Sequence, residues 1–310
     1  MSETESFSDH PRRAEFVGFA EQLADISRSL LSGNSAGAAA QCKSESNPAT
    51  EFDLVVESTL RARINDQYPR HGIVGEEFEP ERRDAEFVWV LDPIDGTRAF
   101  AAGIPVFTTL IALCHRSEPV IGVIDAPASG DRWVGVVGSA TRRNGVETST
   151  RDLRSLEDAV VAWGYPEVTL LEHEAGANAL RAATAWRVYG SGSFGFGSLA
   201  SGALDIAVES GDVVESDVCA LVPVVNGAGG WCTDAFGEPI TLHNGTSCLA
   251  AGTRELHAQA VRLLNSGNQA LDTRGARGAE LPKAGADRRG LEMPPIWPRR
   301  LSQRTTDEGR

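Results

Sequence analysis

The chain has 310 residues, 41% of them hydrophobic, and a formal net charge of −14. A surface this acidic repels the phosphate backbone of nucleic acids, so we expect no nucleic-acid partner. No apolar run approaches the roughly 18 residues of a membrane-spanning helix, so no membrane association is expected either. Five cysteines without C-x-x-C spacing are typical of reduced thiols, and together these features predict a soluble, cytoplasmic protein.

The first half of the chain, residues 1–151, is predicted to be an α+β unit rich in antiparallel strands. Apolar side chains recur at a helical period over residues 11–31, and a second helix is predicted over residues 50–65. Asp53 lies one turn before Glu57 in this second helix, so the two carboxylates share one face. Strands are predicted where short apolar runs occur, near residues 87–91, 106–114, 119–125 and 132–137.

Acidic residues stand where predicted elements begin or end, in three separated segments. Glu76 follows a short predicted strand, and Asp217 opens a segment typical of a helix that runs into a glycine turn. Asp92 and Asp95 bracket a bend in the segment Asp-Pro-Ile-Asp-Gly-Thr, where Pro93 is predicted to end a buried strand. Two carboxylates about 4 Å apart repel each other by roughly 4 kcal/mol at an effective dielectric of 20, so a fold keeps such a pair with cations.

A structural explanation exists for one of these segments. Asp-Gly is a common turn, and Asp95 could cap a helix that begins at Thr97. Such a turn does not explain why carboxylates also stand at the ends of two other predicted elements. Because Mg²⁺ prefers oxygen ligands from carboxylates, water and phosphate, the three segments together predict a metal site beside a phosphate.

The second half, residues 152–265, is predicted to alternate strands and helices, and residues 266–310 form a tail whose Gly-, Pro- and Arg-rich composition predicts disorder. Residues 190–195 match the pattern G-x-G-x-x-G, which could indicate a dinucleotide-binding oxidoreductase. The match lies deep in the chain rather than at the start of a series of βαβ units, which argues against that function. Elements of this half are predicted near residues 159–162, 173–185, 187–189 and 203–209.

Taken together, the Gly-Glu-Glu segment, the DPIDGT segment, and Asp217 with its apolar helix and Gly-Ala-Gly-Gly resemble the inositol monophosphatase-like superfamily of lithium-sensitive, Mg²⁺-dependent phosphatases. The resemblance runs from about Phe16 to about Leu264. It is closest to the histidinol-phosphatase branch, on the phrases VWVLDPIDGTRAF, GIPVFTTLIAL and ALVPVVNGAGG. It implies a layered αβαβα sandwich, of the inositol monophosphatase and fructose-1,6-bisphosphatase type, and a homodimer.

Carried over residue by residue, the resemblance implies a site for two or three Mg²⁺ ions. Glu76, Asp92 and the carbonyl of Ile94 would hold the first ion. Asp92 would bridge to a second ion, which Asp95 and Asp217 would complete. One ion would lower the pKa of a bound water, and another would stabilise the leaving alkoxide oxygen.

The resemblance also implies roles for residues around the metals. Gly96 and Thr97 would present backbone donors to the substrate phosphate at a helix start, where peptide dipoles favour an anion. Asp53 and Thr97, together with Glu76, would orient and deprotonate the attacking water. Neither a Ser or Cys nucleophile nor a His base is required, and the six histidines have no metal-like spacing.

The substrate loop departs from the histidinol-phosphatase pattern, which is close to YG-x-D-C-Y-x-Y. This chain has YGSGSFGF, so Gly192 stands where the pattern has Asp. Candidate substrate-binding residues are Ser191, Gly192, Glu209 and Arg98; Arg132 is a further candidate, and structural salt bridges are the alternative for both arginines. The leading prediction is hydrolysis of L-histidinol phosphate in histidine biosynthesis. An inositol monophosphatase or other sugar or nucleotide phosphatase, and a catalytically silent paralogue, are the alternatives.

Overall fold

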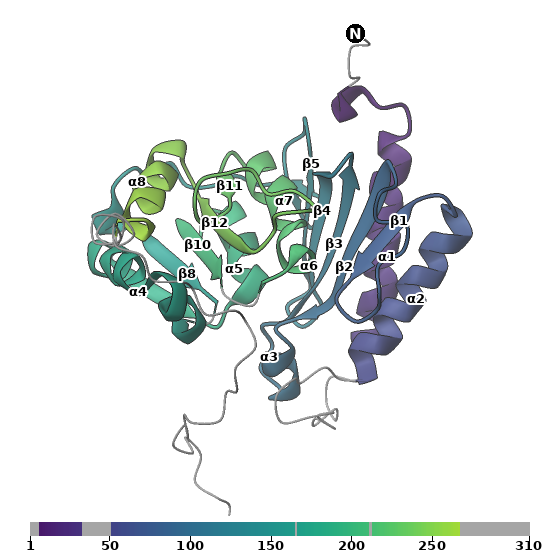
Figure 1. The fold of residues 1–310 in the computed structure, drawn as a ribbon, viewed down its shortest axis with the longest axis horizontal. Helices are drawn as coiled ribbons and strands as arrows, with labels where there is room; N and C mark the ends of the chain where they lie inside the picture. Colours follow the sequence, from purple (N-terminus) through teal and green to yellow (C-terminus); the bar gives the residue numbers. More distant parts are fainter. Residues whose placement is uncertain (1–5, 33–50, 165, 211–212, 267–310) are drawn as a thin grey trace, which may run out of the picture.

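The computed structural model describes residues 6–32, 51–164, 166–210 and 213–266. Two β-sheets alternate with three layers of helices, in the order helix, sheet, helix, sheet, helix (Figure 1). This is the layered αβαβα sandwich that the sequence predicts. The predicted tail lies outside the described residues beyond Ser266, and the division into domains at residue 151 stays a prediction.

The first sheet has seven strands in chain order, and it is antiparallel except for the parallel pair at its start. The mainly antiparallel character predicted for the first half is therefore confirmed. The sequence did not reveal the short hairpin at the other edge, because its two strands are too short to carry a period. The strands are β1 (Gly72–Gly75), β2 (Phe87–Asp95), β3 (Thr108–His115), β4 (Glu118–Ala126), β5 (Asp131–Val136), β6 (Arg142–Arg143) and β7 (Val146–Glu147).

Strand β2 continues past Pro93, where the sequence predicts its end. Its pairing with β3 is regular up to Asp92, is interrupted, and resumes where Asp95 faces Thr108 in a shifted register. The irregularity removes the need for a ladder donor at the proline. The N–H of Ile94 instead donates to Asp92 Oδ1 at 2.9 Å. The prediction of a strand end was wrong because it ignored this local rearrangement.

Two long helices cover the outer face of the first sheet (Figure 1). Helix α1 (Arg13–Ser32) follows a short 3₁₀ turn, η1 (Phe7–Asp9), and helix α2 (Glu51–Gln67) lies beside it. Both present the predicted apolar faces: Phe16 and Leu23 of α1 and Leu60 of α2 are fully buried with Trp89 of β2. This core fixes α2, which carries Asp53, against the sheet.

The second sheet has the strand order β11-β12-β10-β8-β9. Its strands are β8 (Val160–Trp163), β9 (Trp186–Tyr189), β10 (Ile206–Ser210), β11 (Trp231–Thr233) and β12 (Ser247–Ala251). Strands β10, β8 and β9 are parallel to one another, whereas β12 is antiparallel to both of its neighbours, β10 and β11. The sequence predicts β8, β9 and β10 but misses β11, which has only three residues, and β12, which follows the irregular segment 234–246.

Most of the remaining helices lie between the sheets or outside the second one (Figure 1). The middle layer contains α5 (Gly192–Ala200), α6 (Glu215–Val218) and α7 (Leu221–Gly227). The outer layer contains α4 (Pro166–Ala183) and α8 (Arg254–Leu264), of which α8 was not predicted. The short α3 (Thr97–Ala101) follows β2, and η2 (Leu156–Asp158) precedes β8. Among the described residues, no helix has the length and apolar character needed to cross a membrane.

The structure describes four of the five cysteines. Cys114, Cys219, Cys232 and Cys248 are all buried, and none of these four forms a disulfide. Cys42 lies outside the described residues.

Candidate metal centre

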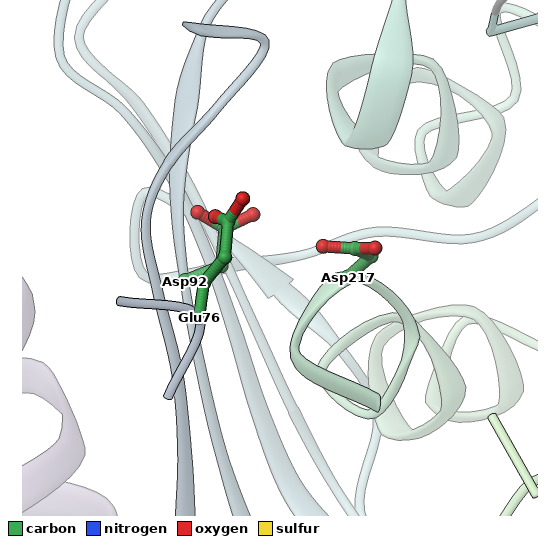
Figure 2. Close-up of side chains that lie close together, drawn as sticks. All are labelled: Glu76, Asp92 and Asp217. Atoms are coloured by element: carbon green, nitrogen blue, oxygen red, sulfur yellow. The ribbon is translucent and has the colours of Figure 1, made fainter. Parts of the chain in front are cut away.

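Three carboxylates from distant parts of the chain converge between the two sheets. Glu76, Asp92 and Asp217 each offer an oxygen, and these three oxygens lie within 4.8 Å of one another. Glu76 follows β1, Asp92 is in β2 and Asp217 is in α6. Figure 2 shows Glu76 and Asp92 side by side, with Asp217 facing them from the α6 side. The sequence predicted all three as ligands of one site.

Helix α2 holds the backbone that carries Glu76. The fully buried Glu57 accepts a hydrogen bond from the N–H of Glu77 at 2.9 Å through one carboxylate oxygen. Its other oxygen accepts a hydrogen bond from Arg61 Nε at 2.7 Å. A buried ion pair of this kind is costly to break on one side, so it fixes the loop after β1 against α2.

Asp217 is held at the start of α6. Its Oδ2 accepts a hydrogen bond from the N–H of Val214 at 2.8 Å, in the manner of a helix cap. Glu215 of the same helix forms an ion pair with Arg83 at 2.5 Å, from the loop between β1 and β2. The two halves of the chain are thus joined beside the carboxylate cluster.

The cluster is destabilised by its own charge. Burial and then repulsion from Glu76 raise the pKa of Asp92 well above its ordinary range. Loss of hydration and repulsion from Asp217 raise the pKa of Glu76 to about 8, although Glu76 as a whole residue is exposed at the rim of the cluster. Burial raises the pKa of Asp217 to about 7.

No Lys, Arg or His of the described residues forms an ion pair with any of the three carboxylates. A cluster of like charges that includes a buried carboxylate and lacks a positive partner is rarely kept for stability, because its self-repulsion is uncompensated. An all-oxygen set of carboxylates is what Mg²⁺ and similar hard cations bind. The residues present therefore fit the metal that the resemblance implies.

Asp95, predicted to ligate the second ion, points toward the start of α5. Its Oδ2 accepts a hydrogen bond from the N–H of Ser193 at 2.8 Å and a second from the Ser193 hydroxyl. Gly192 makes this approach possible: its φ is +47°, and a Cβ there would lie 2.8 Å from the same oxygen. A carboxylate thus occupies the helix start in the G-x-G-x-x-G segment, where a dinucleotide phosphate would otherwise bind, and this argues against the oxidoreductase alternative.

Asp53, Gly96 and Thr97 are the other site residues predicted in the first half of the chain. Asp53 is fully buried on α2, close enough to the cluster that its charge helps to raise the pKa values of Glu76 and Asp92. The hydroxyl of Thr97 donates to the Ile94 carbonyl at 2.9 Å, and Gly96 precedes α3. 

Two other predictions concern arginines. Arg98 is exposed on α3. Arg132 forms ion pairs with Asp125 and with Asp25 of α1, at 2.5 and 2.7 Å. The structure therefore supports a structural salt bridge for Arg132 and not substrate binding, because its guanidinium lies on the face of the sheet that packs against helix α1.

The predicted substrate residues of the second half line the carboxyl ends of its parallel strands. Glu209 is near the end of β10, and Ser191 follows β9. Within the described part of the chain, Glu209 Oε2 and Ser191 Oγ are buried without a hydrogen-bond partner. Burial, then repulsion from Asp95 and Asp217, raises the pKa of Glu209 well above its ordinary range. Gly164 allows this placement, since a Cβ there would lie 2.1 Å from Glu209 Oε1.

Sequence reasoning missed three supports of the site. The pair formed by Glu57 and Arg61 gave a partial signal, since the two residues are four apart on a predicted helix. Ser193 and Gly164 gave no signal beyond their small size, because their roles depend on contacts made across the fold.

Comparisons with known proteins identify a family for the chain. The sequence pattern that describes the Inositol monophosphatase family matches residues 11–269. The chloroplastic bifunctional phosphatase IMPL2 of Arabidopsis thaliana is 37% identical over 72% of this chain; the match spans 66% of that relative, slightly less than two thirds of its length. A histidinol-phosphatase of Mycobacterium tuberculosis is 34% identical over 73% of this chain and 87% of its own.

A solved structure shares the fold as well as the sequence. An inositol monophosphatase from Zymomonas mobilis superposes with a TM-score of 0.75 and 32% identity, over 83% of this chain and 100% of that one. The family match extends over all three segments that supply the carboxylate cluster. The chain therefore belongs to the inositol monophosphatase family.

Proposed function

We propose that the protein is a Mg²⁺-dependent phosphomonoesterase that acts on a small phosphorylated metabolite. The observation that carries this proposal is the convergence of Glu76, Asp92 and Asp217 without a compensating cationic side chain in the described part of the chain. Membership of a family whose enzymes are generally Mg²⁺-dependent supports it. The intact set of carboxylates argues against the silent paralogue.

In this proposal Glu76, Asp92 and Asp217, with Asp95 and the Ile94 carbonyl, hold two or three Mg²⁺ ions. When bound, Mg²⁺ supplies positive charge that lowers the pKa of water and neutralises charge that develops on phosphate oxygens. The protein's own part is to fix these oxygens around the buried carboxylate of Asp92, where electrostatic interactions are stronger than in water.

The other predicted residues orient the reactants. Asp53 and Thr97, with Glu76, position the attacking water and accept its proton. The backbone N–H groups of Gly96 and Thr97 donate to the phosphate oxygens. Such positioning is the main catalytic contribution that a protein makes to phosphoryl transfer.

The leading substrate is L-histidinol phosphate. Histidinol carries an ammonium group, and a cation of this kind would compensate the buried carboxylate of Glu209. The hydroxyl of Ser191, also buried without a partner among the described residues, would bind a further polar group. The similarity to a histidinol-phosphatase over 87% of that protein's length supports this choice.

An inositol monophosphatase is the second candidate. Gly192 removes the carboxylate of the histidinol-phosphatase pattern, so the pocket has one group fewer for a cationic substrate. Sugar hydroxyls would donate to Glu209 equally well, and the inositol monophosphatase from Zymomonas mobilis is 32% identical.

Phosphate release from a panel of esters tests the proposal. The panel contains histidinol phosphate, inositol 1-phosphate, fructose 1,6-bisphosphate and adenosine 3′,5′-bisphosphate, each with Mg²⁺ and with EDTA. We expect Mg²⁺-dependent release, fastest from histidinol phosphate, and none from the Asp92→Asn variant. Preference for the inositol ester would select the second candidate, and no metal-dependent release from any ester would favour the silent paralogue. Light scattering would test the predicted homodimer.

A further inference from the structure

A chain of three side chains links the first sheet to helix α5 at Asp95. Ser193, on the first turn of α5, donates to Asp95 Oδ2 from both its N–H and its hydroxyl. The hydroxyls of Ser193 and Thr108 are also hydrogen-bonded to each other. Thr108 is fully buried and Ser193 is 3% exposed, so water does not compete for these contacts.

The direction of the hydrogen bonds follows from counting protons. An ionised carboxylate can only accept, so the single hydroxyl proton of Ser193 is used on Asp95. The Thr108 hydroxyl must then donate to Ser193 Oγ. Thr108 is also the strand partner of Asp95 across β2 and β3. Ser193, which holds the carboxylate from α5, is thus itself held by the sheet that carries Asp95.

Both hydrogen bonds from Ser193 go to the same oxygen of Asp95. The Gly96 backbone N–H also donates to this carboxylate, so its rotation is restricted on more than one side. Oδ1 is the oxygen that Ser193 does not use. A carboxylate held through one oxygen presents the other in a fixed direction, as partners in the second coordination shell do in known metal sites.

We propose that Ser193 is a positioning residue that orients Asp95 toward a bound divalent ion, with Thr108 orienting Ser193 in turn. The proposal rests on the proposed function, because it assumes that Asp95 is a metal ligand. Its consequence is that α5 couples metal affinity to the substrate loop, since Ser191 and Gly192 precede Ser193 directly.

Manganese binding to the purified, metal-free full chain tests this inference without any substrate. Calorimetric titration with Mn²⁺ compares the wild type with Ser193→Ala and with Thr108→Val, a change of nearly the same shape. The matched control is Ser201→Ala, because Ser201 at the end of α5 accepts a hydrogen bond from Trp133 Nε1 of the first sheet at 2.8 Å. This control also removes a contact between the two halves but does not touch Asp95.

We expect Ser193→Ala to weaken the binding of at least one Mn²⁺ by about tenfold or more. Thr108→Val weakens it less, Thr108→Ser restores it, and Ser201→Ala leaves it within about twofold of wild type. Phosphate release by Ser193→Ala should recover toward the wild-type rate as the Mg²⁺ concentration is raised, since a weakened site fills again.

Wild-type Mn²⁺ affinity in Ser193→Ala would overturn the positioning role and leave the proposed phosphatase untouched. Equal loss of affinity in Ser201→Ala would also overturn it, because the effect would then reflect general loosening of the interface. If Ser193→Ala does not fold, the comparison of Thr108→Val with Thr108→Ser decides in the same way. Absence of Mn²⁺ binding by the wild type would overturn both proposals.

Discussion

The seven-stranded sheet carries a buried carboxylate on each of its two faces. Asp92 of β2 pairs with Leu110, which packs in the core between the sheets. Asp125 of β4 pairs with Thr109, whose hydroxyl contacts Ser27 of α1 at 2.6 Å. Residues directly opposite each other in an antiparallel pair share a face. Asp92 therefore faces the second sheet, whereas Asp125 faces α1.

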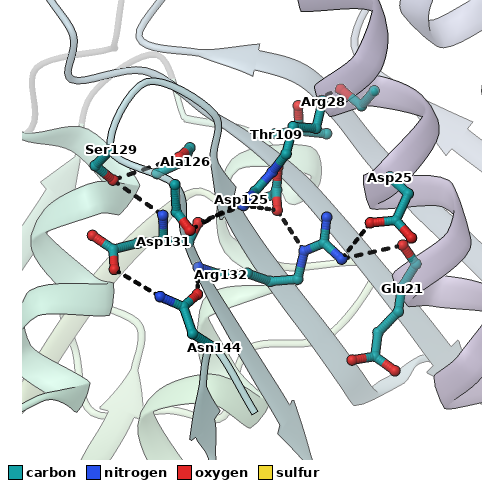
Figure 3. A network of polar contacts seen from close by, with 12 residues as sticks. Glu21, Asp25, Arg28, Thr109, Asp125, Ala126, Ser129, Asp131, Arg132 and Asn144 are labelled. Atoms are coloured by element: carbon teal, nitrogen blue, oxygen red, sulfur yellow. Dashed lines mark hydrogen bonds and ion pairs between the residues drawn. The ribbon is translucent and has the colours of Figure 1, made fainter. Parts of the chain in front are cut away.

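The surroundings of the two carboxylates differ. Asp125 accepts hydrogen bonds from Arg28 at 3.0 and 2.7 Å and from Arg132 at 2.5 Å, within the network drawn in Figure 3. Asp92 lies among other carboxylates and has no cationic side chain beside it in the described structure. Burial alone therefore does not mark a functional acid. A buried carboxylate with arginine partners fastens a helix to the sheet, and one without them indicates a site for a cation.

Removing the uncompensated carboxylate should abolish activity. In Asp92→Asn, several kcal/mol of metal-derived charge stabilisation are lost, so we expect kcat/KM for phosphate release to fall by about a thousandfold or more. Circular dichroism should show a folded protein, because the change also removes repulsion. A variant within tenfold of wild type would contradict the comparison.

Removing Asp125, the carboxylate with arginine partners, should lower stability and leave activity nearly unchanged. Asp125→Ala leaves Arg28 and Arg132 without their buried acceptor, and we expect the free energy of unfolding to fall by about 3 kcal/mol. Urea unfolding measures this loss, and kcat of the folded enzyme should stay within about threefold. A loss of activity as large as that of Asp92→Asn would show that the two faces are not separable.

The stability of the metal-free protein should fall as the pH rises. Glu76 and Asp217 have pKa values raised to about 8 and about 7, so the folded protein binds protons more tightly than the unfolded chain. This contribution is present near pH 4 and is lost as the pH rises toward 8. In EDTA we therefore expect the stability of wild type relative to Asp217→Asn to decrease over that range.

Magnesium should remove this pH dependence, because a bound cation replaces the protons. His71 acts in the opposite direction, since burial lowers its pKa to about 4 and its protonation in acid destabilises the fold. That effect is common to wild type and variant, so the difference in melting temperature between them isolates the cluster. Identical differences in EDTA at pH 5 and pH 8 would be inconsistent with a repulsive cluster.

Removing an exposed carboxylate should have the smallest effect on the free energy of unfolding. The side chain of Asp66 is 78% exposed and pairs with Arg63 at 3.2 Å on α2. Solvent screens such a pair, so Asp66→Ala should change the free energy of unfolding by no more than about 0.5 kcal/mol. Urea unfolding checks this value, and a loss comparable to that of Asp125→Ala would mean that burial is not the deciding variable.

The sequence predicts those features of the fold and the site that depend on short segments of the chain. Glu76, Asp92 and Asp217 could be singled out because the sequence predicts an element boundary at each of them, although β2 in fact continues past Asp92. The layered fold could be predicted because the same motifs carried a family resemblance. Both depend on short stretches of chain.

The remaining features depend on contacts between distant segments. The orientation of Asp95 toward Ser193 joins residues 98 positions apart, and no periodicity encodes it. The ion pairs of Arg132 with Asp125 and Asp25 depend on the packing of α1 against the sheet, which no sequence pattern encodes. The sequence shows that β2 contains a proline. It does not show that the pairing of β2 with β3 shifts register between Asp92 and Asp95, which lets the strand continue past Pro93.

Diffraction from crystals soaked in Mn²⁺ tests the metal centre most directly, because the anomalous signal of manganese locates it independently of activity. We expect at least one strong anomalous peak within coordination distance of carboxylate oxygens of Glu76, Asp92 and Asp217. At the same Mn²⁺ concentration, no peak should appear beside Asp125. A saturated crystal with no peak among the three carboxylates would contradict the assignment of this cluster as the metal centre.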